Sequence, residues 1–422
     1  MAHYKHYIGV TSQAAFCSVP LRLDSYSDCQ YACSFCFAKA RGGNRSSSPN
    51  ASTNAKALAD RLGRVSRGDC RSAVDEMLER RIPIQLGGMT DPFSPWEARH
   101  RSTLNLLHIL AEYDYPTLIS TKGTLIGEPE YRSALKAGNF YIRFSFTVAD
   151  PLLAAHLELG VPSQERRLQV MAALAEDGAS LGARFQPLIL GHEDAAIRLL
   201  PYIKAAGAQH VAVEYLKWPM EQRQHHSVLL SRHLPGHLDT YINLGGRRVG
   251  REYVLPADFK IRRLSTLKTR AEEIGLVFGY AENDLLHLNG FRSCCNAADL
   301  FLRDANFFED NILARIKAPS HRKFFNSIPA DTWHPEHDLL VYMNSHSRSP
   351  KDSPAKDTWR TYLAAKWVAP PWRGGPSSFY RLRETSERDA GGLSVFETPT
   401  DIHPEMETDQ CPSREAEETV DL

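Results

Sequence analysis

The sequence predicts an α/β protein whose core is an open, partial (β/α)6 barrel. Strand-like and helix-like stretches alternate between Val19 and Leu216, with the spacing of parallel strands joined by crossover helices. About six such units are present, whereas a closed barrel of this kind has eight. Beyond Trp218 the alternation fades, which predicts α+β additions after the barrel.

The strand candidates are short apolar segments. In chain order they are VPLRLDS (19–25), IPIQLGG (82–88), PTLISTKG (116–123), YIRFSFT (141–147), LGARFQPLIL (181–190) and HVAVEYL (210–216). Apolar residues at helical spacing predict helices at 72–81, 95–113 and 163–178. Ser163 is expected to cap the last of these helices.

Composition divides the chain into four expected regions. We expect a core barrel at residues 1–220. A substrate-covering region with a basic stretch is expected at 221–320, and an accessory region at 321–383. The accessory region includes a polar, proline-punctuated linker at 345–357. Twelve acidic and two basic residues lie from Glu384 onward, so 384–422 is predicted to be a disordered acidic tail.

The overall charge, the first residues and the number of cysteines indicate which class of protein to expect. The formal net charge of the 422 residues is zero, so no global field attracts nucleic acid or an anionic membrane. The start, MAHYKHYIGVTSQAAF, lacks the apolar core of a secretory signal, and no apolar run is long enough to span a bilayer. Eight cysteines are too few for a disulfide scaffold. We therefore expect a cytoplasmic protein without a membrane partner.

Three cysteines cluster in CQYACSFCF: Cys29, Cys33 and Cys36, at a C-x3-C-x2-C spacing. A structural zinc site needs four ligands, and no fourth stands at a usual spacing. Three unrelated buried thiols are another alternative. We favour thiolates that hold an iron–sulfur cluster with one iron left open, because a catalytic metal centre needs an open coordination position.

Other candidate residues follow the same predicted strands. The cysteines come after the first strand, Gly87 and Gly88 after the second, and Lys122 after the third. In parallel α/β folds, chemistry collects at the carboxyl ends of the strands. These residues are therefore expected to face one mouth of the barrel.

The cysteine motif, with Phe35 before its last cysteine and a strand before its first, resembles the radical S-adenosylmethionine (SAM) superfamily. The segments GGMTDPFSPWE, ISTKGTLI, RFSFTVAD, GVPSQERRLQVMAALAEDG and RFQPLIL resemble its spore photoproduct lyase-like branch, often labelled DNA repair photolyase-like. The resemblance implies a [4Fe-4S] cluster on the three cysteines and SAM on the open iron. It also implies reductive cleavage of SAM to a 5′-deoxyadenosyl radical, with an electron donor such as flavodoxin or ferredoxin.

The resemblance also implies which residues contact SAM. Singly, each has an ordinary structural explanation as a turn, a solvated lysine or a strand hydroxyl, but their order along the strand ends favours the functional one. The glycine turn would contact the amino group of SAM, and Lys122 would contact its carboxylate or ribose. Ser145 would contact the ribose, and the fifth strand would line the adenine. The complete set is Gly87, Gly88, Thr90, Asp91, Lys122, Ser145, Gln186 and Leu188.

The chain departs from the spore photoproduct lyases at Met89. Those enzymes carry a cysteine there, which returns a hydrogen atom to the product radical, and methionine has no S–H bond to do so. Lyase activity itself is therefore in doubt. Cys294 and Cys295 are an alternative catalytic hydrogen donor, if the later region brings them to the barrel mouth; a buried structural pair is the competing explanation.

A basic stretch at 247–270 has eight basic and two acidic residues, interleaved with aromatic side chains. It is either a solvated face or a surface for a phosphate backbone. The residues expected to bind nucleic acid are Arg247, Arg248, Arg251, Lys260, Arg262 and Arg263. The expected function is thus a radical SAM enzyme acting on nucleic acid or a nucleotide. A peptide or metabolite substrate, or a non-enzymatic zinc-binding module, are the alternatives.

Overall fold

A computed structural model describes residues 8–40, 51–147, 150–219, 225–295, 298–317, 323–326, 332–343 and 359–398. Its centre is a curved sheet whose strands follow the order β1-β2-β4-β5-β6-β8-β9-β13. All neighbouring strands pair in parallel except β1, which is antiparallel to β2. The strands are β1 Ile8–Val10, β2 Leu21–Leu23, β4 Ile84–Leu86, β5 Thr117–Thr121, β6 Phe140–Phe146, β8 Ser180–Leu188, β9 His210–Tyr215 and β13 Val277–Tyr280.

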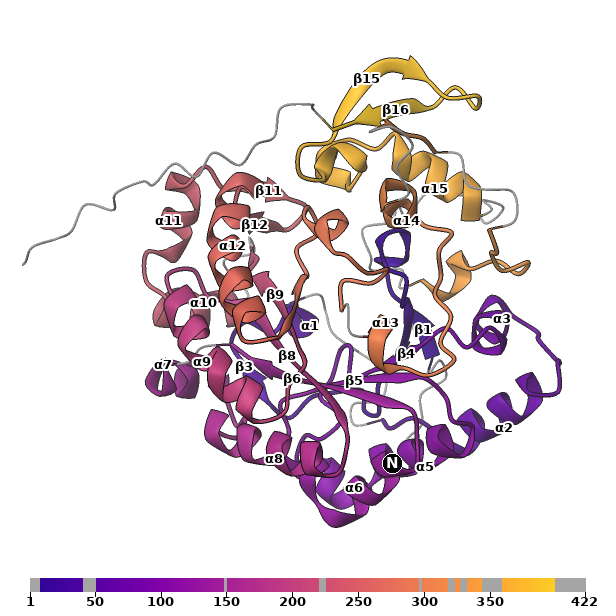
Figure 1. The fold of residues 1–422 in the computed structure, drawn as a ribbon, viewed down its shortest axis with the longest axis vertical. Helices are drawn as coiled ribbons and strands as arrows, with labels where there is room; N and C mark the ends of the chain where they lie inside the picture. Colours follow the sequence, from indigo (N-terminus) through magenta and orange to yellow (C-terminus); the bar gives the residue numbers. More distant parts are fainter. Residues whose placement is uncertain are drawn as a thin grey trace, which may run out of the picture.

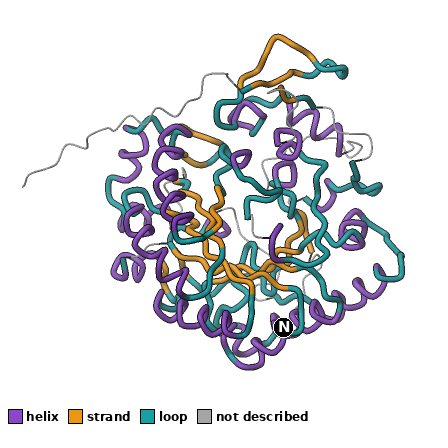
Figure 2. Tube along the Cα trace, in the orientation of Figure 1, coloured by secondary structure: helices purple, strands orange, loops and turns teal. Residues whose placement is uncertain are grey.

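Helices cover the outer side of the curved sheet, as Figures 1 and 2 show. The strands β5, β6 and β9 are buried along their whole length, in agreement with their largely apolar sequences. The longer helices are α2 Ala55–Val65, α3 Ala73–Glu79, α5 Ser102–Glu112, α6 Pro129–Lys136, α7 Pro151–Leu157, α8 Gln164–Glu176, α9 Glu193–Ala205, α10 His225–His233, α11 His237–Asn243, α12 Ala257–Glu273 and α15 Trp359–Trp367. The shorter ones are α1 Phe37–Ala40, α4 Glu97–His100, α13 Ala298–Phe301 and α14 Ile312–Lys317.

The predicted partial barrel is confirmed. Each of the six strand candidates contains a strand of the main sheet, and the helices between them cross over the outside. Ser163 caps α8 as expected, because its side chain accepts a hydrogen bond from the amide of Arg166. The helix expected at 95–113 is divided into α4 and α5 at Arg101, whose φ of 51° is left-handed.

Two strands of the main sheet were not predicted. β1 precedes the first predicted strand, and β13 comes from the region after Trp218 where the alternation fades. Both are three or four residues long. The barrel therefore continues past residue 220, the boundary that composition suggested.

Smaller sheets complete the fold. The pair β3 Ala32–Cys33 and β7 Glu158–Leu159 is antiparallel, and so are β10 Trp218–Pro219, β12 Glu252–Val254 and β11 Arg247–Val249. A third sheet contains β14 Lys323–Phe324, β16 Ser394–Glu397 and β15 Arg383–Arg388.

The prediction of a disordered tail from 384 onward is wrong for its first part. β15 and β16 pair there, and Val395 and Phe396 of β16 are buried. The indole nitrogen of Trp367 donates to the carbonyl of Ser394 at 2.7 Å, which ties this acidic segment to α15. The rest of the tail (399–422) and the linker expected at 345–357 lie outside the described residues. Within the described part of the chain, no helix combines the length and apolarity needed to cross a membrane.

Candidate functional site

The three clustered cysteines lie on the loop that leaves β2 and enters α1. Cys33 belongs to β3 and stands opposite Glu158 of β7, so a pair of backbone strands fixes its position. The amide of Cys36 donates to the carbonyl of Cys33 at 3.2 Å, which closes a tight turn between them. All three are free, half-buried thiols. They share one edge of the barrel with the residues that follow β4 and β5.

The surroundings of these thiols disfavour isolated thiolates. Burial, with the nearby carboxylate of Asp91, raises the pKa of Cys29 to about 12. Burial also raises the pKa of Cys33 to about 12, with Glu158 adding to the shift and Lys122 opposing it. Thiolates here need compensating cations, which the irons of a cluster supply.

The donor set is three thiols on one short loop, the type and number of ligands that a [4Fe-4S] cluster with one open iron would take. Among the described residues, no three His, Cys, Asp or Glu side chains converge closely enough to hold one metal ion. In an iron–sulfur cluster each thiolate binds a different iron, so the thiols stand further apart.

The glycine turn after β4 is a tight backbone passage. Gly87 has a φ of 84°, and a Cβ on it would lie 2.4 Å from the carbonyl oxygen of Ser120. Asp24 supports the turn, because its Oδ1 accepts hydrogen bonds from the amides of Met89 (2.8 Å) and Thr90 (3.0 Å). Burial raises the pKa of Asp24. We did not single out Asp24 from the sequence, although its place directly after β2 is the same signal that identified Lys122.

Thr90 and Asp91 use their side chains to hold this loop. The Thr90 hydroxyl donates to the carbonyl of Tyr26 at 3.0 Å and is buried. The carboxylate of Asp91 accepts from the Thr121 hydroxyl (2.7 Å) and the Lys122 amide (2.6 Å). These bonds tie the loop after β4 to the end of β5. Contact of either residue with SAM stays a prediction.

Lys122 is held within the protein. Its Nζ donates to Glu158 Oε1 at 2.6 Å and to the Thr147 hydroxyl at 3.0 Å, and lies 5.4 Å from the ring centre of Phe35. Arg167 donates to the other oxygen of Glu158 at 2.9 Å. Burial opposes ionisation of Glu158, yet Lys122 and Arg167 together lower its pKa to about 2. Lys122 must leave this ion pair, or share it, to reach a cofactor.

The expected ribose and adenine residues lie on neighbouring strands. Ser145 is buried on β6, and its carbonyl accepts from Arg167 at 2.6 Å. Gln186 is half-buried on β8 and donates to the carboxylate of Glu214. Leu188 has no exposed surface and belongs to the hydrophobic core. Of these, Gln186 is the side chain with surface open to a ligand.

Comparison with known proteins bears on the fold. No known family profile matches the chain. Uncharacterized proteins of Mycobacterium tuberculosis and Mycobacterium bovis are 28% identical over 204 residues, which are 46% of this chain and 59% of each relative. The match thus spans less than two thirds of those relatives.

Among solved structures, a spore photoproduct lyase with a tyrosine-to-phenylalanine substitution superimposes with a TM-score of 0.51 at 15% identity, covering 66% of this chain and 80% of the other. A spore photoproduct lyase with a cysteine-to-alanine substitution superimposes with a TM-score of 0.50 at 15% identity, covering 66% of this chain and 81% of the other. The chain has a radical SAM, spore photoproduct lyase-like fold.

Within this fold, Cys295 lies away from the mouth of the barrel, where it was expected. Cys295 is buried against Leu118 and Tyr141, which belong to the first halves of β5 and β6, whereas the cysteine loop lies at the opposite ends of the strands. Its thiol donates to the Ser293 hydroxyl at 3.1 Å. Cys294 is half-buried. The helix α13 packs against the start of β6, where the ring of Phe301 stacks on that of Tyr141 with 5.5 Å between the ring centres.

The expected nucleic-acid residues divide into two groups. Lys260 is buried, 2.8 Å from Glu282 and 2.5 Å from Asp284, so its assignment to a nucleic-acid surface is wrong. These ion pairs could not be predicted from the sequence, because the two acids lie in a distant segment of the chain, after β13. The other five are exposed or nearly so: Arg247, Arg248, Arg251, Arg262 and Arg263.

The basic strand β11 lies on the same side of the radical SAM barrel as the cysteine loop. Its sheet partner β12 pairs with β10, which follows directly from the carboxyl end of β9. Phe35 of the cysteine loop packs into one hydrophobic cluster with Trp218 and Tyr253. Tyr253 therefore packs inward. The cluster joins the small basic sheet to the cysteine loop.

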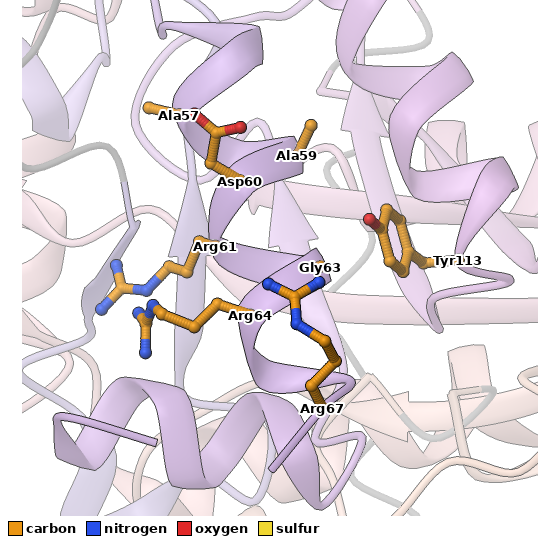
Figure 3. A pocket seen from close by; sticks show the side chains of 8 residues that line it. All are labelled: Ala57, Ala59, Asp60, Arg61, Gly63, Arg64, Arg67 and Tyr113. Carbon is orange, nitrogen blue, oxygen red and sulfur yellow. The ribbon is translucent and has the colours of Figure 1, made fainter. Parts of the chain in front are cut away.

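A separate surface groove of about 670 Å³ lies along α2, with Arg61 and Arg64 on the side opposite Tyr113 (Figure 3). None of its lining residues belongs to the cysteine loop or the strand ends. Arg61 and Arg64 pair with the buried carboxylate of Asp75 at 2.6 and 3.1 Å. These arginines therefore stabilise the packing of α2 on α3, and we assign no ligand to the groove.

Proposed function

We propose that this chain is a radical SAM iron–sulfur enzyme whose substrate is a nucleic acid or a nucleotide. One observation carries the proposal: three free thiols stand on a tight loop at the carboxyl edge of a spore photoproduct lyase-like barrel. Cys29, Cys33 and Cys36 would hold a [4Fe-4S] cluster. Such a cluster supplies the electron that cleaves SAM to methionine and a 5′-deoxyadenosyl radical, which abstracts hydrogen from a substrate.

The chain's own residues would position these partners. The Gly87 turn brings backbone close to the mouth, since no side chain fits there. Asp24 and Asp91 fix that turn against β5. The Lys122–Glu158–Arg167 network stands beside Cys33 and keeps positive charge next to the cysteine loop.

Nucleic acid is favoured as the substrate by the basic strand next to this loop. Arg247 and Arg248 are exposed on β11, and the sheet that carries them packs on Phe35 through Trp218 and Tyr253. A phosphate backbone held by these arginines would pass close to the mouth of the barrel.

The enzyme assignment is tested by anaerobic reconstitution of the full chain with iron and sulfide. We expect about four irons and four sulfides per chain, and reduction in the presence of SAM should yield 5′-deoxyadenosine. One zinc per chain with no sulfide and no 5′-deoxyadenosine would overturn the assignment.

The substrate assignment is tested by nucleic-acid binding across salt concentrations. A plot of the logarithm of the association constant against the logarithm of salt concentration has a negative slope. In the double variant Arg247→Glu with Arg248→Glu, the magnitude of this slope should decrease by about 1.4 to 1.8, because two phosphate contacts are lost. Arg99→Glu with Arg198→Glu, exposed on α4 and α9, makes the same change in net charge away from β11. Equal slopes for the two double variants would show that only net charge matters and would exclude a site at β11.

A further inference from the structure

The interior of the barrel carries a layer of arginines below the cysteine loop. Arg143 of β6 is in register with Ser120 of β5, and Arg184 of β8 is in register with Ser145, two residues further along β6. The side chains of Arg143 and Arg184 thus lie on the same face of the sheet as diagonal neighbours. Arg22 of β2 also stands close enough to Arg184 to repel it electrostatically.

This layer has little compensating negative charge. Arg143 is 5% exposed and donates to the Ser120 hydroxyl at 3.0 Å, while its Nε is buried without a hydrogen-bond partner. The Nε of Arg184 is also buried without a partner. Among the described residues, neither guanidinium lies within 4.0 Å of a carboxylate oxygen. Glu214 acts to raise the pKa of Arg184, but its carboxylate already accepts hydrogen bonds from Gln186 and Lys217.

The side chain of Arg184 is less enclosed than its neighbours along β8. It is half-buried, although Ala183 and Phe185 on either side of it along β8 are fully buried. Burial and the repulsion from Arg143 lower its pKa to about 9. A charged guanidinium kept in such a place is costly unless an anion joins it. Cys294 is close to these arginines: burial raises the pKa of its thiol to about 12, and Arg143 and Arg22 oppose that shift.

We propose that Arg143 and Arg184, with the Ser120 hydroxyl, bind a phosphate group of the substrate inside the barrel. A phosphodiester offers two charged oxygens and two ester oxygens, so each of two guanidinium groups on adjacent strands has an oxygen to bind, whereas a single guanidinium pairs with both oxygens of a carboxylate. The inference rests on the proposed function and narrows it: the nucleotide that reacts enters the barrel with a phosphate pointing toward β6 and β8.

The experiment compares the full-length, iron-loaded wild type with Arg184→Gln and with Arg198→Gln, an exposed arginine of α9, as the matched control. Calorimetry at constant ionic strength measures the binding of inorganic phosphate, malonate, a dithymidine monophosphate and thymidine. Loss of one charged hydrogen-bonding partner should weaken binding of the dinucleotide by about 10- to 100-fold in Arg184→Gln, and should leave Arg198→Gln unchanged.

Melting temperatures separate binding from folding. Arg184→Gln should melt at or above the wild type without phosphate, because it removes a desolvated like charge, and should gain less than the wild type when the dinucleotide is added. An Arg184→Lys variant should recover part of the binding. Destabilisation of Arg184→Gln that is independent of ligand would show a purely structural arginine and overturn the proposal.

The ligand series identifies the group that binds. Malonate bound as tightly as phosphate would overturn the assignment to phosphate, and Arg184-dependent binding of inorganic phosphate alone would overturn the assignment to substrate. Formation of 5′-deoxyadenosine without substrate is measured in parallel and should persist in Arg184→Gln. A wild type that forms none would reject the enzyme function, while calorimetry still reports on the arginine site.

Discussion

Replacement of Glu158 by Gln removes one negative charge from a buried network next to the cysteine loop. Glu158 is 3% exposed in its side chain, and its partners Lys122 and Arg167 are 12% and 1% exposed. Glutamine keeps the shape but leaves the two cations without an anion. Removing one member of a buried ion pair costs about 3–5 kcal/mol.

The pKa of Glu158 gives a second measure of the same interaction. Its fall from 4.5 to about 2, at about 1.4 kcal/mol per pH unit, corresponds to about 3 kcal/mol of stabilisation. A carboxylate with a lowered pKa in the folded state stabilises the fold above its unfolded pKa. That stabilisation is lost as the pH falls from about 4.5 toward 2.

Urea unfolding followed by tryptophan fluorescence provides the assay. At pH 7 the midpoint of Glu158→Gln should correspond to a loss of about 3 kcal/mol, and the difference from wild type should shrink to about half by pH 3. Glu165→Gln, on the exposed face of α8, should change stability by less than about 0.5 kcal/mol at either pH. Equal stability of the two variants at pH 7, or a difference that does not vary with pH, would refute an ionised Glu158.

Three further predictions concern the cysteine loop and its supports. Cys33→Ala should lose bound iron and 5′-deoxyadenosine formation together, whereas Cys70→Ala, a half-buried thiol near α3, should retain both; iron retained by Cys33→Ala would contradict the cluster. Gly178→Ala is the control for Gly87→Ala, because Gly178 shares the positive φ but its added Cβ would meet nothing within 4 Å; we expect it to cost about 1–2 kcal/mol. Gly87→Ala should cost at least about twice as much, because its Cβ would also clash with Ser120. Similar unfolding midpoints of the two variants would exclude that clash. Asp24→Ala should expose the amides of Met89 and Thr90 to hydrogen exchange, while Asp24→Asn should protect them, because it keeps an acceptor oxygen without the buried charge; equal protection in both would show that the turn does not depend on Asp24.

The sequence was sufficient for features that depend on neighbouring residues along the chain. Six strands of the barrel are apolar runs long enough to be recognised singly, and the end of each strand locates the residues at the mouth. The spacing of Cys29, Cys33 and Cys36 is equally local. The strands β1 and β13 escaped notice because three or four residues carry too little periodic signal.

Only the tertiary structure decided which charges meet. Lys122 pairs with Glu158, and Lys260 with Glu282 and Asp284, across 36, 22 and 24 residues of chain. Arg143 and Arg184 become neighbours through the register of β6 and β8. The charge of a side chain is known from the sequence, but its partner and its exposure depend on which distant segments pack together. For this reason the location of the cysteine site was predictable from the sequence, whereas the state of the lysines and arginines around it was not.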